Sequence, residues 1–127
     1  MTQAQWNALV EHAAEEAPNE CCGFLRVSDG NVEEVARATN LRASPYGYEL
    51  DAASLLRVNE LDDEGWGVAI YHSHPRSRAE PSQTDINLAN YPHWTYLIVS
   101  LARPEEPAIR AWRIADGRVE EQPLTVE

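Results

Sequence analysis

The sequence predicts an α/β fold in which helices flank a mixed β-sheet. Two Asp-Gly turn signals, at residues 29–30 and 116–117, each lie between strand-like segments and indicate hairpins. Segments with helical periodicity alternate with these strands, which favours a sheet with helices packed on its faces. The chain has 127 residues, no internal repeat and no linker-like tract, so we expect one domain over residues 1–127.

The first third of the chain is predicted to form a helix followed by a hairpin. Residues 2–17 place apolar side chains on one helical side, and Thr2 with Gln5 forms a capping-box pattern at the start. Residues 22–27 and 32–39 are strand-like segments around the first Asp-Gly turn. We therefore expect the helix to pack on the sheet that this hairpin begins.

The middle of the chain is predicted to form two strands with a helix between them. Residues 46–50 favour a short strand, and Asp51 can cap a second helix that ends near Gly65. Residues 66–72 form a compact apolar run whose length suits a buried strand. A polar stretch with two prolines then follows, which predicts a loop.

The last third of the chain is predicted to be mainly strand. A helix-start pattern occurs at Ser82. Residues 94–102 are rich in aromatic and β-branched side chains and give the clearest strand in the chain. Residues 108–114 and 118–126 flank the second Asp-Gly turn and predict a closing hairpin.

The composition excludes several classes of partner. Ten basic and 21 acidic residues give a formal net charge of -11, which argues against nucleic acid or an anionic membrane surface as a partner. No apolar run reaches the roughly 18 residues that cross a bilayer. The N-terminal residues lack the features of a signal peptide, and the only cysteines are the neighbours Cys21 and Cys22, so we expect a cytoplasmic protein.

All ten basic residues are arginines, and the chain has no lysine. One interpretation is adaptation of the whole proteome to high salt or to a GC-rich genome. The other is that an enzyme acting near lysine-tagging machinery avoids being tagged. The lysine content of other proteins from the same source would separate the two hypotheses.

The motif that indicates chemistry is His72-Ser73-His74-Pro75, followed after six residues by Ser82-Gln83-Thr84-Asp85. Two histidines separated by one residue on a strand point to the same face. Asp85 lies one turn into the next predicted helix and can reach the same point. Two imidazoles and one carboxylate suit zinc, and three protein ligands leave one position open, as in catalytic sites.

Each part of this pattern also has a simpler explanation. A His-x-His pair can be only a polar strand end, and Ser82-x-x-Asp85 can be only a helix capping box. Glu20 alone is a charged residue after a helix. Five specified residues at fixed spacing have a chance probability on the order of 10⁻⁵ in a chain of this length, which favours a site.

These residues resemble the signature of the JAMM (MPN-type) metallopeptidase family, in which an upstream glutamate precedes His-x-His-Pro, six residues and Ser-x-x-Asp. Pro18-Asn19-Glu20-Cys21-Cys22-Gly23 resembles the segment that carries the upstream glutamate. The resemblance covers nearly the whole chain and is to a minimal prokaryotic member. It implies the MPN fold, a mixed sheet similar to that of cytidine deaminases.

The resemblance also implies a site and a substrate class. One catalytic Zn²⁺ would be held by His72, His74 and Asp85. Glu20 would act as general base and then general acid, and Ser82 would donate a hydrogen bond to the developing oxyanion. Family members hydrolyse amide or isopeptide bonds after the C-terminal tail of ubiquitin-like proteins, and small prokaryotic ones resemble enzymes that act on sulfur-carrier proteins.

Two alternative functions fit the sequence less well. A zinc nucleobase deaminase requires His-x-Glu and Pro-Cys-x-x-Cys, and the chain has neither. A catalytically silent MPN-type scaffold that binds proteins usually lacks one or more ligands, whereas here all stand together with Glu20. The identity of the substrate, the residue released, the oligomeric state and any activating partner do not follow from the sequence.

Overall fold

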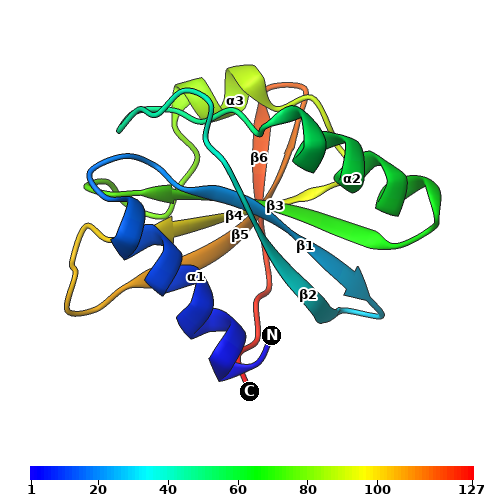
Figure 1. The fold of residues 1–127 in the computed structure, drawn as a ribbon, viewed down its shortest axis with the longest axis horizontal. Helices are drawn as coiled ribbons and strands as arrows, with labels where there is room; N and C mark the ends of the chain where they lie inside the picture. The colour runs from blue at the N-terminus through cyan, green and yellow to red at the C-terminus, as the bar shows by residue number, and fades with distance from the viewer.

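The computed structural model describes residues 1–127, and its centre is a six-stranded sheet with the order β2-β1-β3-β4-β5-β6 (Figure 1). The β3–β4 pair is parallel and the other four pairs are antiparallel, so the sheet is mixed, as predicted. The strands are β1 (Cys22–Ser28), β2 (Asn31–Ala38), β3 (Gly67–His74), β4 (Thr95–Ser100), β5 (Ala108–Ala115) and β6 (Arg118–Gln122).

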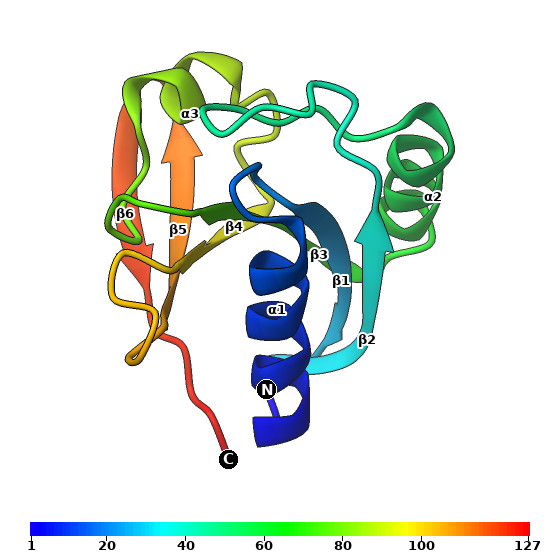
Figure 2. The ribbon, with the colours of Figure 1, turned by 60° about the vertical axis from the view of Figure 1, so that its left-hand side comes forward.

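Helices lie on both faces of the sheet (Figure 2). Helix α1 (Gln3–Glu16) packs Leu9 and Ala13 against one face, in a core built on Tyr71 and its neighbours. Helices α2 (Ala52–Asp63) and α3 (Gln83–Leu88) cover the other face, where the larger core contains Trp94 and Ile98. Alternate residues of β3 therefore enter different cores. No helix is long and apolar enough to span a membrane.

The turns and caps form where the residue types favour them. Thr2 accepts a hydrogen bond from the Gln5 backbone, and the Gln5 side chain accepts one from Thr2, which confirms the predicted capping box. Both hairpin turns use an Asp-Gly pair with positive φ, 51° and 79° at the first and 53° and 74° at the second. Asp and Gly adopt this conformation at low cost, so the predicted hairpins are confirmed.

Gly23 is required where three strands approach one another. A Cβ atom at this position would lie 2.3 Å from the Tyr71 ring and 2.4 Å from the Ala36 carbonyl oxygen. Both atoms belong to the strands that pair with β1 on its two sides. The absence of a side chain at Gly23 therefore lets β1 lie between β2 and β3 and brings the segment before it close to the end of β3.

Three predictions about the elements were wrong in part. Residues 46–50 do not form a strand; the segment from residue 40 to residue 50 has only the isolated bridges Asn40↔Leu50 and Ser44↔Gly47. Strand β3 continues to His74, because its parallel pairing with β4 extends to Ser100. The last strand ends at Gln122, although it was predicted to reach residue 126.

Candidate metal centre

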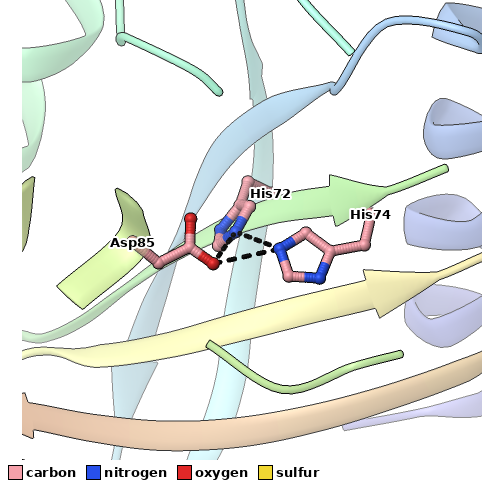
Figure 3. Close-up of side chains that lie close together, drawn as sticks. All are labelled: His72, His74 and Asp85. Atoms are coloured by element: carbon pink, nitrogen blue, oxygen red, sulfur yellow. Dashed lines mark hydrogen bonds and ion pairs between the residues drawn. The ribbon is translucent and has the colours of Figure 1, made fainter. Parts of the chain in front are cut away.

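The candidate metal ligands meet where β3 ends and α3 begins (Figure 3). His72 Nε2 and His74 Nε2 are 3.2 Å apart, and Asp85 Oδ2 lies 3.2 Å from the first and 3.0 Å from the second. All three side chains are buried. Two histidines of one strand and an aspartate 11 and 13 positions further along the chain therefore place three donor atoms around one point.

The spacing of these atoms fits one zinc ion. Tetrahedral ligands at about 2.0–2.1 Å from zinc lie about 3.3 Å from one another, close to the three observed distances. Without a bound ion, the contact between the two buried imidazole nitrogens would contribute little stability. In addition, the buried Nδ1 of His72 has no hydrogen-bond partner. The donor set is two nitrogens and one carboxylate oxygen, which suits zinc but does not by itself identify the ion.

The His74 ring is oriented by a backbone contact. Its Nδ1 lies 2.8 Å from the carbonyl oxygen of Arg78, so Nδ1 must be the protonated nitrogen. In the neutral ring, this tautomer leaves the lone pair of Nε2 directed at the other two donors, the arrangement that metal-binding histidines commonly show. The His72 ring is held differently, by stacking on Tyr48 with ring centroids 4.4 Å apart and planes 18° from parallel.

The electrostatics of the three residues favour a bound cation. Burial raises the pKa of Asp85, but hydrogen bonds from His72 and His74 outweigh it and hold that pKa well below its ordinary value. Burial lowers the pKa of His72. Burial also opposes protonation of His74, yet its hydrogen bonds to Asp85 and to the Arg78 carbonyl raise its pKa. An ionised carboxylate thus faces two imidazoles, and a metal would replace the shared proton.

Glu20 is buried immediately before β1. The register of β1 places Cys22 opposite His72, so the chain at Glu20 runs past the end of β3. Its Oε1 is buried without a hydrogen-bond partner. Burial raises the pKa of Glu20 to about 8, and the charge of Asp85 acts in the same direction while His74 acts against it. A carboxyl group in this state can exchange a proton near neutral pH.

Ser82 is the N-cap of α3, as predicted. Its Oγ accepts a hydrogen bond from the Asp85 backbone at 3.0 Å, and its own backbone N–H donates to Asp85 Oδ2 at 2.9 Å. The carboxylate oxygen that closes the capping box is therefore the one that faces both imidazoles. The Ser-x-x-Asp pattern can therefore be a helix cap and part of a metal site at the same time.

Several residues that hold the site were not predicted from the sequence. Tyr48 stacks on His72, and Ser73 Oγ accepts a hydrogen bond from the Cys21 backbone at 2.8 Å. The loop between the ligands is tied to β4 and β5, since Ser100 Oγ donates to the Ser77 carbonyl at 2.6 Å and Trp112 Nε1 donates to the Ala79 carbonyl at 2.9 Å. No spacing signal marks these contacts, because each joins distant parts of the chain.

Comparison with known proteins identifies the family. Residues 2–115 match the family described as prokaryotic homologs of the JAB domain. The CysO-cysteine peptidase of Mycobacterium tuberculosis is 40% identical over 124 residues, covering 94% of this chain and 85% of that protein. The desampylase of Haloferax volcanii is 38% identical over 96 residues, covering 71% of this chain and 68% of that protein.

A solved structure shows a similar fold. The solution structure of protein DSY2949 from Desulfitobacterium hafniense is similar to this fold with a TM-score of 0.84 at 35% identity, covering 99% of this chain and 90% of that one. The match extends over the whole sheet and all three helices of this chain. The chain therefore belongs to the prokaryotic JAMM/MPN family and is a hydrolase of its metallopeptidase type.

Proposed function

We propose that residues 1–127 form a single zinc metallopeptidase domain that hydrolyses amide or isopeptide bonds after the C-terminal tail of a ubiquitin-like or sulfur-carrier protein. The observation that carries this proposal is the convergence of two imidazole nitrogens and one carboxylate oxygen within 3.2 Å, beside a buried glutamate whose carboxylate oxygen Oε1 has no partner. A purely structural metal site would have four protein ligands and would need no such carboxylate.

In the proposed mechanism His72, His74 and Asp85 hold the zinc ion. Bound zinc would supply Lewis-acid chemistry, making water more acidic and polarising the scissile carbonyl. Glu20 accepts a proton from the attacking water and delivers it to the leaving amine. Burial raises the pKa of Glu20 in the metal-free protein, and a proton donor and acceptor works best when its pKa is near the working pH.

Ser82 is proposed to stabilise the developing oxyanion. Its Oγ already accepts a hydrogen bond from the Asp85 backbone, so the hydroxyl proton remains available to donate. Loss of one such donor typically costs about 10²–10³ in turnover. Ser82 is exposed at the start of α3, where a substrate can reach it.

The substrate class is supported by the relatives and by the surface next to the site. One relative is named a CysO-cysteine peptidase and the other a desampylase, and we base the proposed substrate class on these two names. A mainly apolar cavity of about 270 Å³ shares Tyr48 with the metal centre. Strand β2 is an edge strand whose Ala38 lies opposite Cys22, which offers backbone groups to an extended tail.

The test is mass spectrometry on a small sulfur-carrier protein whose Gly-Gly terminus is extended by a few residues. It is incubated with the wild type, with Glu20→Gln and with the wild type plus a chelator. We expect cleavage after Gly-Gly by the untreated wild type alone, with Glu20→Gln still binding one zinc ion per chain. A protein that purifies without zinc and keeps its function after Asp85→Ala would instead be a binding scaffold.

A further inference from the structure

The segment from residue 40 to residue 50, between β2 and α2, folds against the backbone of Glu20. We propose that Asn40 is a positioning residue that uses this segment to hold Glu20 at the metal centre. This inference rests on the catalytic role proposed above for Glu20. It concerns a residue whose side chain makes no hydrogen bond to the candidate ligands or to the Glu20 carboxylate.

Asn40 uses both ends of its side-chain amide. Its Nδ2 donates to the carbonyl oxygens of Glu20 at 3.0 Å and Gly47 at 3.1 Å. Its Oδ1 accepts from the backbone N–H groups of Arg42 and Glu49, both at 3.0 Å. An amide side chain has two donor hydrogens and two acceptor lone pairs, so all four are used. One residue thus closes the segment on itself and joins it to Glu20.

The backbone of Glu20 is held by this segment from two sides. Its carbonyl accepts the hydrogen bond from Asn40, and its N–H donates to the carbonyl of Ser44 at 2.8 Å. The Glu20 side chain, by contrast, has a buried Oε1 without a partner. Hydrogen bonds to that oxygen therefore do not place the carboxylate. Its position depends on the backbone, and the backbone depends on Asn40 and Ser44.

The same segment reaches the metal ligands. Tyr48, one residue after Gly47, stacks on the His72 ring with centroids 4.4 Å apart. The bridges Asn40↔Leu50 and Ser44↔Gly47 keep the two halves of the segment together. The segment thus contacts the carboxylate-bearing residue at one end and a ligand at the other. Closing it through Asn40 sets the distance between the two.

Aspartate is the informative replacement, because it has the same size and keeps the acceptor that faces Arg42 and Glu49. It removes both donor hydrogens and places a carboxylate oxygen against the carbonyl oxygens of Glu20 and Gly47. Small displacements of a catalytic group are costly; a shift of about 1 Å can reduce turnover about 10²-fold. Asn40→Asp should therefore affect the chemical step more than substrate binding or zinc binding.

The experiment compares Asn40→Asp with Asn59→Asp, using the zinc-loaded protein. Asn59 is the matched control, since its Nδ2 also donates to a backbone carbonyl, that of Leu55 at 2.9 Å, but within α2. We expect Asn40→Asp to keep one zinc ion per chain and a KM within about threefold of wild type, and to lose about 10- to 100-fold in kcat. Asn59→Asp should keep wild-type kcat.

A second readout does not depend on activity. Hydrogen exchange of the Glu20 amide, followed by NMR, should become at least about tenfold faster in Asn40→Asp, because its acceptor at Ser44 is no longer held in place. If Asn40→Asp does not fold, Asn40→Ala removes the two donor bonds and also the two bonds that Oδ1 accepts, without adding a charge. Glu20→Gln is measured in parallel.

The outcomes separate the two proposals. Turnover by Glu20→Gln would overturn the proposed function of Glu20, whatever Asn40 does. An inactive Glu20→Gln together with wild-type kcat and wild-type Glu20 exchange in Asn40→Asp would overturn the positioning role alone. Loss of zinc from Asn40→Asp would also overturn it, since the defect would then lie in the ligands.

Discussion

Glu20→Gln should make the stability of the metal-free protein less dependent on pH, as well as inactivate the enzyme. Burial raises the pKa of Glu20 from an ordinary value of 4.5 to about 8. When the pKa of a group is higher in the folded than in the unfolded protein, the group does not reduce stability at a pH below its unfolded pKa. As the pH rises from the unfolded pKa to the folded pKa, the free energy of unfolding decreases. The wild type should therefore become less stable between about pH 4.5 and about pH 8, whereas glutamine cannot ionise.

The magnitude follows from the pKa difference. From 4.5 to about 8 is about 3.5 pH units, and at 1.36 kcal/mol for each unit the full cost is on the order of 5 kcal/mol. The same linkage gives a cost of about 2 kcal/mol at pH 6 and about 4 kcal/mol at pH 8. The difference between the variants should thus widen by about 2 kcal/mol between these two pH values.

The assay is urea unfolding of the chelator-treated proteins at pH 6, 7 and 8. The quantity to compare is how the difference in free energy of unfolding between Glu20→Gln and the wild type changes with pH. The difference at a single pH is less informative, because a buried glutamine amide also needs hydrogen-bond partners and shifts it by a constant amount. Glu33→Gln removes the same formal charge from an exposed position on β2 and controls for net charge. A free-energy difference between Glu20→Gln and wild type that stays constant from pH 6 to pH 8 would refute the reasoning.

Three further predictions concern the site and the sheet that carries it. Asp85→Asn should weaken zinc binding more than the loss of a hydrogen-bond partner of a ligand does, which costs roughly 10–100-fold. Zinc affinity is measured by competition with a chelating dye, and a wild-type affinity would exclude Asp85 as a ligand. Tyr71→Phe should cost about 1–3 kcal/mol in urea unfolding, because it leaves the buried His12 Nδ1 without its 2.7 Å partner. Its zinc affinity should not change, since Tyr71 faces the α1 side of the sheet. Gly23→Ala should cost about 1–3 kcal/mol, seen as a lower melting temperature by circular dichroism, because its methyl group would overlap the Ala36 carbonyl; an unchanged melting temperature would show that the strands can separate at no cost.

The elements with strong local signals were predicted well. The two Asp-Gly turns adopt positive φ, and the caps at Thr2, Asp51 and Ser82 form as their sequences indicate. The segment at residues 46–50 was predicted wrongly because its aromatic residues favour a strand, whereas in the structure the segment pairs only through isolated bridges to residues 40 and 44. Local propensity cannot report whether a partner exists.

The burial pattern of the helices shows the same limit. Leu56 of α2 is apolar and yet 62% exposed, while the polar His12 of α1 is 3% exposed. Helical periodicity indicates which residues share a side but not how wide a stripe the sheet covers. His12 can be buried because its Nδ1 forms a hydrogen bond with the Tyr71 hydroxyl, and these two residues are 59 positions apart in the sequence.

The sequence by itself indicated the family and the candidate metal site, because the types and spacing of His72, His74 and Asp85 on one strand and the next helix leave few other arrangements. Only the tertiary structure decided how the site is held. The Glu20 backbone is fixed by Asn40 and Ser44, the His72 ring by Tyr48 and the His74 ring by the Arg78 carbonyl. These contacts use ordinary residue types and several backbone groups, so they exist only once the chain has folded.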